Sequence, residues 1–228
     1  MLRVLVPLVL LALTETSTSQ SDSGLVSEYR LFDVVWGPSN PVATTIANSS
    51  FFIEKLRSRN LTESSYNRFI DHDAHYLRGI SHVLEAPINS LQEADDVRSL
   101  LQDTLKHYTS RNQTSLASLT PPWLNYTLRC FKSMVKEEPV YWLVALSARA
   151  SFLNLLVEGR CSKDQVEQSS TFYKQWCDDN MVESHWMQRY KTILEGHKDQ
   201  INPDTAINIF RVQMMNQKSF YRALDPDK

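Results

Sequence analysis

Apolar residues recur every three or four positions along most of the chain, which is the spacing of an amphipathic α-helix. In the segment 62–86, apolar side chains occupy positions 69, 70, 74, 77, 80, 83 and 84. Thr62 is a residue type that caps helix starts, and Pro87 lacks the amide hydrogen that a helix interior requires. The pattern therefore predicts a helix that begins near Thr62 and ends before Pro87.

The same spacing predicts helices in most other parts of the chain. The predicted helices cover residues 42–57, 62–86, 90–111, 123–138, 139–159, 168–180, 182–200 and 204–224. The segment 139–159 is apolar on most sides, so we expect it to be the central, buried helix. These helices predict an all-α bundle, in which a site is assembled from side chains that project inward from facing helices.

The composition favours helices over β-rich folds and narrows the expected partners. Only 5 of the 228 residues are glycine, whereas β-sandwiches, barrels and Rossmann domains use glycine in many tight turns. The chain carries 24 basic and 26 acidic side chains, with no long run of either sign. We therefore expect a small molecule or a protein as partner, and neither nucleic acid nor a membrane.

The N-terminal segment has the features of a signal peptide. Arg3 precedes an apolar run over residues 4–13, and small polar residues follow it. This run is far shorter than the roughly 20 apolar residues of a membrane-spanning helix. We predict a signal peptide over residues 1–20, a single domain over residues 21–228, and a protein that is secreted or lumenal.

Glycosylation signals agree with passage through the secretory pathway. The triplet Asn-x-Ser/Thr is the acceptor of N-linked glycans. It occurs at Asn48, Asn60, Asn112 and Asn125. We predict glycosylation at these asparagines.

The chain has 3 cysteines, an odd number for an oxidising compartment. Cys161 ends one predicted helix, and Cys177 belongs to the next helix after a short loop. We therefore predict a Cys161–Cys177 disulfide, which would stabilise the fold by roughly 3 kcal/mol. Cys130 is then free or bonded to another chain. Cysteines this scattered do not predict a zinc site.

Several motifs follow one another in a particular order. The stretch NSSFFIEKLRSRNLTESSYNRFIDHDAHYLRGI joins an apolar helix, a turn with leucine, and a helix that contains the pattern aromatic, apolar, x, x, Asp, x, x, Tyr, Leu. Tyr126 and Thr127 form a Tyr-Thr pair, Tyr173 and Trp176 form a Tyr-x-x-Trp motif, and RVQMMNQKSFYRAL is a terminal segment with aromatic residues. In this order and spacing, the chain resembles the TenA/thiaminase II proteins.

The resemblance covers most of the chain after the signal peptide. It implies the haem-oxygenase-like all-α fold, a multi-helix bundle with a central buried pocket. The family hydrolyses thiamin or aminopyrimidines in that pocket, and its members commonly assemble as dimers or tetramers. We therefore expect a homodimer or homotetramer, and no cofactor.

The resemblance assigns ligand-binding roles to particular residues. Asp73 would bind the amino and ring-nitrogen edge of a pyrimidine, because one carboxylate accepts two donors and binds more strongly when desolvated. Tyr76 and Tyr126 would line the same pocket. These residues match the family's motifs.

Other positions depart from the family's pattern. Aligned without gaps, Arg149 occupies the position of the nucleophilic cysteine and Leu153 that of a partner tyrosine. Asn180 falls where a pocket tyrosine is expected, and Gln217 where a proton-transferring glutamate is expected. Arginine stays protonated at neutral pH, and glutamine is neither acid nor base. We therefore expect Arg149, Asn180 and Gln217 to bind ligand, and assign no catalytic residue.

Two sources of replacement chemistry stay open. A branch of the family uses acidic residues in place of the cysteine, and Glu137, Glu138 and Glu183 are near in sequence. Each of these acids can equally lie at a helix end facing water. Cys130, one turn after Tyr126, could face the pocket as a displaced thiol, although a buried structural cysteine is the commoner case.

The polar residues around Asp73 have two further explanations. Asp73 can be a buried carboxylate that pairs with Arg149 and holds two helices together; an arginine there would also favour a carboxylate or phosphate ligand. His72 and His75 are spaced like metal ligands, but His72 lies about 100° around the helix from Asp73. We predict no metal site, and expect Asp71 and His72 to face away from the pocket.

The sequence thus predicts a secreted TenA/thiaminase II-like protein that binds a small heteroaromatic ligand, similar to a thiamin-derived pyrimidine. Two alternatives remain. One is an active C–N hydrolase with substituted catalytic residues. The other is a non-enzymatic secreted interaction module on the same fold.

Overall fold

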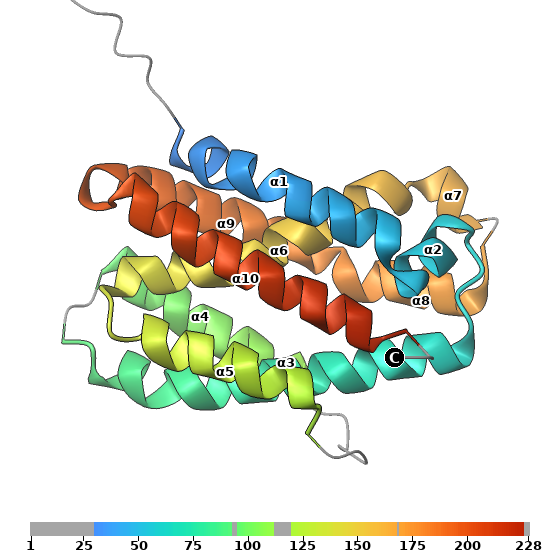
Figure 1. Ribbon diagram of the computed structural model, residues 1–228, viewed down its shortest axis with the longest axis horizontal. Helices are drawn as coiled ribbons and strands as arrows, with labels where there is room; N and C mark the ends of the chain where they lie inside the picture. Colours follow the sequence, from blue (N-terminus) through green and yellow to red (C-terminus); the bar gives the residue numbers. More distant parts are fainter. Residues whose placement is uncertain (1–29, 93–94, 112–119, 168, 226–228) are drawn as a thin grey trace, which may run out of the picture.

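The computed structural model describes residues 30–92, 95–111, 120–167 and 169–225. Every element within these ranges is helical, and they contain no β-strand. The helices run mostly along the long axis of the molecule (Figure 1). They are α1 (Leu31–Ser49), α2 (Phe51–Arg57), α3 (Glu63–Ser90), α4 (Asp96–Arg111), α5 (Pro122–Met134), α6 (Pro139–Arg160), α7 (Lys163–Glu167), α8 (Thr171–Asn180), α9 (Val182–Gly196), the short 3-10 helix η1 (Lys198–Gln200) and α10 (Pro203–Ala223).

Helix α6 is the centre of the bundle, as its apolar composition predicted. It packs against α9 and α10, and also contacts α4, α5 and α8. Positions 140–157 are buried with the exception of Leu155. By length and hydropathy α6 is able to cross a membrane, but 94% of its most apolar window is buried inside the bundle. The helix therefore serves here as a core helix.

The start of the fold differs from the sequence prediction. A single helix was expected over residues 42–57, whereas the structure begins α1 at Leu31 and separates it from α2 at Ser50. Ser50 has an extended backbone, and its side chain accepts a hydrogen bond from the amide of Ile53, so it ends one helix and caps the next. The prolines Pro38 and Pro41 lie inside α1.

Helix α3 begins as predicted and ends later than predicted. The Thr62 side chain accepts a hydrogen bond from the Ser65 amide over 3.3 Å, which is an N-terminal cap. The helix continues through Pro87 to Ser90. Ile88 is fully buried, and this packing keeps one further turn helical despite the hydrogen bond that proline removes.

The structure joins Cys161 and Cys177 by a disulfide, with their Cα atoms 5.6 Å apart. This bond ties the end of α6 to α8. The glycosylation sequons Asn48, Asn60 and Asn125 are exposed. The predicted signal peptide over residues 1–20 and the sequon at Asn112 lie outside the described residues.

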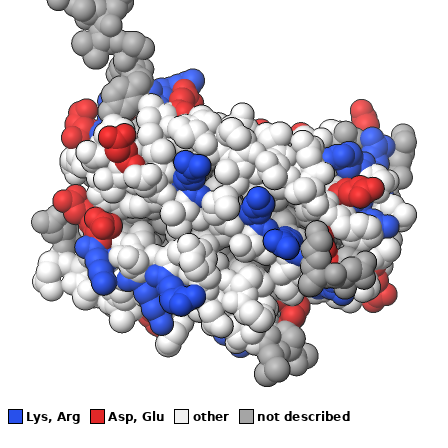
Figure 2. Space-filling view, in the orientation of Figure 1, with Lys and Arg blue, Asp and Glu red and all other residues white. Residues whose placement is uncertain are grey.

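The surface carries charges of both signs. Figure 2 shows acidic and basic side chains spread over the face formed by α1, α5 and α10, with wide uncharged areas between them. Tyr126, Val212 and Met215 are exposed large side chains on α5 and α10. A further group of charged side chains lies inside the bundle.

Candidate functional site

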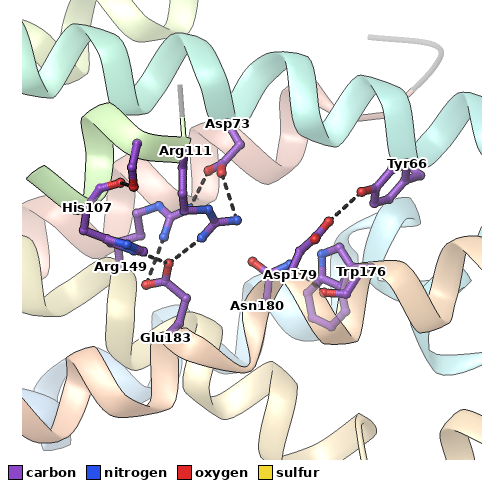
Figure 3. Close-up of polar contacts among 10 residues, drawn as sticks. Tyr66, Asp73, His107, Arg111, Arg149, Trp176, Asp179, Asn180 and Glu183 are labelled. Atoms are coloured by element: carbon purple, nitrogen blue, oxygen red, sulfur yellow. Dashed lines mark hydrogen bonds and ion pairs between the residues drawn. The ribbon is translucent and has the colours of Figure 1, made fainter. Parts of the chain in front are cut away.

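Four charged side chains meet inside the bundle, each from a different helix (Figure 3). Arg149 on α6 donates a hydrogen bond through Nη2 to Asp73 Oδ1 on α3, and its Nη1 lies 3.4 Å from Glu183 Oε2 on α9. Arg111 on α4 donates from Nη1 to Glu183 Oε1 over 2.7 Å. Arg111 Nη2 lies 3.8 Å from Asp73 Oδ2. These four residues are called the charge cluster below.

The amphipathic pattern of α3 and α9 brings the two acids to the interior. Asp73 lies four residues after Phe69 and three before Tyr76 on the buried face of α3. Glu183 lies three residues before Trp186 on the buried face of α9. A carboxylate at such a position requires charged or hydrogen-bonding partners. Arg149 and Arg111 supply those partners.

The charge cluster shifts the pKa values of Glu183 and Arg149. Burial would raise the pKa of Glu183, but Arg149, a hydrogen bond with His107 and the charge of Arg111 outweigh burial and lower this pKa from 4.5 to about 2. Burial likewise disfavours the charge on Arg149, but Asp73 and Glu183 hold the pKa of its guanidinium well above the ordinary value. Glu183 and Arg149 are therefore charged at neutral pH.

Aromatic rings and one histidine surround the charge cluster. The Arg149 guanidinium lies 5.5 Å from the ring centroid of Tyr76, which is a cation–π contact. His107 Nε2 lies 3.4 Å from Glu183 Oε1, and the His107 ring stacks on Trp186 with the centroids 4.6 Å apart. Burial raises the pKa of Tyr76, so its hydroxyl stays protonated at neutral pH.

Buried polar atoms without a hydrogen-bond partner lie beside the charge cluster. Within the described part of the chain, no hydrogen-bond partner is found for Trp176 Nε1, Asn180 Oδ1 or Arg149 Nη1, although Arg149 Nη1 is within ion-pair distance of Glu183. Trp176 and Asn180 are both 0% exposed. Figure 3 shows Asn180 between Glu183 and Trp176. Since buried polar atoms normally have partners, these atoms are exceptions to the usual pairing among the described residues.

The structure buries five of the predicted ligand-binding residues. Asp73, Tyr76, Arg149, Asn180 and Gln217 are each no more than 4% exposed. Asp73 and Arg149 belong to the charge cluster. Their ion pair is the one that the sequence analysis considered as a structural role for Asp73. Tyr76 and Asn180 lie beside the cluster, and Gln217 is buried on α10.

The prediction that Tyr126 lines the central site is wrong. Tyr126 is 55% exposed, and the Arg129 guanidinium lies 6.0 Å from its ring centroid. The buried face of α5 carries Leu124, Thr127 and Phe131. Tyr126 is offset from Thr127 by about 100° around the helix axis. The Tyr-Thr pair therefore contributes its threonine to the interior.

The sequence did not indicate Arg111 or His107, and it offered Glu183 only as one of three possible replacement acids. Arg111 and His107 lie near the end of an amphipathic helix with many exposed charges, and Glu183 fits a water-facing helix end as readily as a buried position. The signal for Glu183 is its spacing from Trp186 and Tyr190, three and seven residues later, which are buried positions of α9. An acid within an apolar stripe predicts a buried partner.

The charge cluster includes no thiol. Cys161 and Cys177 form the disulfide, and Cys130 is a free, partly exposed cysteine on α5. Of the acids considered as replacements, Glu137 and Glu138 are exposed. Glu183 does reach the interior, but a carboxylate with a pKa of about 2 is a weak base and carries no proton to donate.

His72 takes part in aromatic packing. Its Nδ1 accepts a hydrogen bond from Trp123 Nε1 over 3.1 Å, and the two rings stack with centroids 6.0 Å apart. Phe220 on α10 packs edge-on against the same histidine. Burial lowers the pKa of His72, which favours the neutral form. Among the described residues, no group of three or more His, Cys, Asp or Glu is arranged to hold a metal ion.

No protein-family model and no curated protein matches the sequence. The structure is similar to that of a TenA homologue protein from P. horikoshii OT3, with a TM-score of 0.71 and 15% sequence identity. The similarity covers 86% of this chain and 98% of that one. The chain therefore has the all-α, TenA-like helical-bundle fold that the order of its motifs predicted.

Proposed function

We propose that the chain is a secreted TenA-like protein that binds a small heteroaromatic molecule, similar to a thiamin-derived pyrimidine, inside the bundle without hydrolysing it. The main support is a group of available polar atoms. Trp176 Nε1 and Asn180 Oδ1 have no partner within the described residues, and Asp73 Oδ2, which forms an ion pair of 3.8 Å with Arg111, belongs to the charge cluster beside them. An aminopyrimidine offers amino hydrogens to the two oxygens and ring nitrogens to the indole N–H.

The same residues argue against hydrolysis. Attack on a pyrimidine carbon requires a nucleophile and a group that relays its proton. Arg149 cannot be the nucleophile, Gln217 cannot relay a proton, and Glu183 is held ionised by its neighbours. The expected activity is therefore binding alone.

The first experiment measures ligand binding by thermal unfolding in the presence of thiamin and of aminopyrimidines. A ligand that binds only the folded state, at 100 times its dissociation constant, stabilises it by about 2.7 kcal/mol. We expect stabilisation by at least one of these compounds and no released product in a parallel hydrolysis assay. Asp73→Asn should remove the stabilisation, because the amide cannot replace the second accepting oxygen.

Asp178→Asn is the matched control, because Asp178 is an exposed acid on α8. This variant should respond to ligand like the parent chain. Product release that Asp73→Asn abolishes would show an active hydrolase instead. If none of the compounds changes the unfolding temperature, the binding proposal is wrong and the interaction module becomes the better explanation.

Secretion is part of the proposal, and it has independent support. The disulfide between Cys161 and Cys177 and the exposed sequons at Asn48, Asn60 and Asn125 suit an oxidising, glycosylating compartment. When the full chain is expressed in eukaryotic cells, we expect it in the medium and sensitive to a glycosidase. Retention in the cytosol without glycans would contradict secretion.

A further inference from the structure

A groove outside the charge cluster opens between α1, α2, α6 and α8. Its volume is about 450 Å³, which is in the range of small-molecule sites. Arg57 at the end of α2, Arg59 in the following turn and Arg160 at the end of α6 all line it. No acidic residue is among the described residues that line the groove.

The described residues provide no counter-charge for the three arginines. None of them forms an ion pair with an acid within the described ranges. Arg57 donates to the carbonyl oxygen of Ala47 over 2.8 Å and to Asn48 Oδ1 over 3.4 Å, contacts that orient its guanidinium without neutralising it. Arg160 Nε is buried and has no hydrogen-bond partner in the described part of the chain.

The positive charges also repel one another. Burial, and after it the charge of Arg57, lowers the pKa of Arg160. Both effects oppose the protonated form, and a bound anion would relieve both. Without an anion, the neighbouring positive charges destabilise the folded chain. A bound anion would stabilise it.

The backbone fixes two of the three arginines in place. Arg59 has a φ of 55°, in the left-handed region that non-glycine residues seldom adopt. Its carbonyl oxygen accepts a hydrogen bond from the Ser170 amide over 3.5 Å. Arg160 directly precedes Cys161, which the disulfide ties to Cys177 on α8. The charges are therefore held on rigid supports, as a binding site requires.

We propose that this groove binds a small molecule that carries a phosphate or sulfate ester. Guanidinium groups bind such oxyanions through pairs of N–H donors. Leu155, which is 37% exposed, and Gly159 form an apolar side of the groove that would contact the rest of the ligand. The groove shares no residue with the charge cluster, so this proposal does not depend on the proposed function.

The test removes two of the charges and keeps the backbone. Arg57→Gln/Arg59→Asn is suitable, because asparagine tolerates the left-handed conformation of residue 59. Binding of inorganic phosphate, inorganic sulfate and a sulfated monosaccharide is measured by calorimetry on the full chain, with chloride at equal ionic strength as reference. We expect the double variant to bind at least about tenfold more weakly than the parent chain.

Arg78→Gln/Arg129→Gln is the matched control, since both of these arginines are exposed and lie elsewhere on the surface. This control should bind like the parent chain. An equal loss in both double variants would show a non-specific charge effect and overturn the proposal. Protein with glycans trimmed to one sugar is measured in parallel, so that a glycan at Asn48 or Asn60 does not hide the groove.

A second variant tests the location of the site by filling it. A Cβ atom at Gly159 meets nothing within 4 Å, so Gly159→Leu adds a side chain beside the groove without straining the helix. A Cβ at Gly196 also meets nothing within 4 Å, which makes Gly196→Leu the control. We expect only Gly159→Leu to weaken binding of the sulfated monosaccharide.

The outcomes separate this proposal from the proposed function. Both groove variants should keep the stabilisation by an aminopyrimidine, and Asp73→Asn should keep the binding of anions. If the sulfated monosaccharide binds more tightly than inorganic sulfate, the ligand is an ester whose organic part also contacts the groove. If phosphate, sulfate and the monosaccharide all behave like chloride, the groove is not an anion site.

Discussion

Arg149 lies on a helix whose other central residues are mostly apolar, and it contacts two acids from two other helices. The four residues of the charge cluster carry two positive and two negative charges. Removing one of them leaves an uncompensated charge in the core, which is more costly than removing a whole pair. Single substitutions in the cluster therefore have larger effects than their individual contacts suggest.

A double-mutant cycle between Asp73 and Arg149 tests this coupling. We expect Arg149→Met alone to lower the free energy of unfolding by roughly 3 kcal/mol or more. Asp73→Asn/Arg149→Met should lose less than the sum of the single variants. The exposed pair Asp103 and Arg189 is the control, where Asp103→Asn/Arg189→Met should cost less than about 1 kcal/mol. Urea unfolding measures all of these values, and additive losses would show that the buried pair is not coupled.

The lowered pKa of Glu183 predicts a dependence of stability on pH. The folded chain binds fewer protons at Glu183 than the unfolded chain, so this contribution is complete above the unfolded pKa of about 4.5 and decreases as the pH falls toward about 2. Its full size is roughly 3 kcal/mol, because one pKa unit corresponds to about 1.36 kcal/mol.

Glu183→Gln should remove this part of the acid transition. The difference in free energy of unfolding between the parent chain and Glu183→Gln is therefore expected to shrink from pH 5 to pH 2. Unfolding by urea at a series of pH values measures it. A difference that does not change with pH would mean that the pKa of Glu183 is not shifted by folding.

At the residue scale, the sequence could identify those site residues that a helix period and a family motif both support. Asp73 and Tyr76 are of this kind, and both are buried. Tyr126 matches the family motif, but it lies on the exposed face of its helix. Arg111 had neither a motif nor a local signal that separates a buried charge from an exposed one. Glu183 had only its spacing from buried residues of α9, which does not name the partner, because that partner lies on another helix.

At the element scale, the long helices follow from the apolar period because each covers the core with one face. The break at Ser50 was not predicted, because the apolar residues before and after it keep nearly the same spacing. The extended backbone of Ser50 and the hydrogen bond from the Ile53 amide to the Ser50 side chain distinguish two helices from one. The turn after Pro87 depends on the burial of Ile88, which is a tertiary effect.

The effect of the disulfide on stability is measured by removing both of its cysteines. Cys161 and Cys177 close a loop with a sequence separation of 16, and the loss of such a crosslink lowers stability by roughly 3 kcal/mol. We expect Cys161→Ser/Cys177→Ser to unfold at lower urea and to be insensitive to reductant. Cys130→Ser, which removes the free thiol, should behave like the parent chain. An unchanged midpoint in the double variant would contradict a stabilising bridge.

At the scale of the whole molecule, composition and motif order were sufficient for the fold, because a TenA-like bundle is specified by many weak signals spread over the chain. The interior of that bundle depends on a few residues, and the sequence describes it only in part. The resemblance suggested a pocket around Asp73. In the structure, Asp73 Oδ1 accepts a hydrogen bond from the guanidinium of Arg149.

The resemblance also predicts assembly, which the single chain does not test. We expect a homodimer or homotetramer in solution, measured by light scattering during size-exclusion chromatography. Val212 and Met215, three residues apart on α10 and both exposed, are apolar enough to belong to a contact between copies. A mass equal to one chain at micromolar concentration would contradict the predicted assembly.

The charge cluster also limits how this chain can change over evolutionary time. A single change of Arg149 to cysteine would supply a thiol, but it would leave Asp73 and Glu183 with Arg111 as the remaining cation of the cluster. The loss of one cation from the buried cluster would destabilise this variant. We therefore expect a path from this chain to a thiol enzyme to include a second substitution that removes one of the two acids.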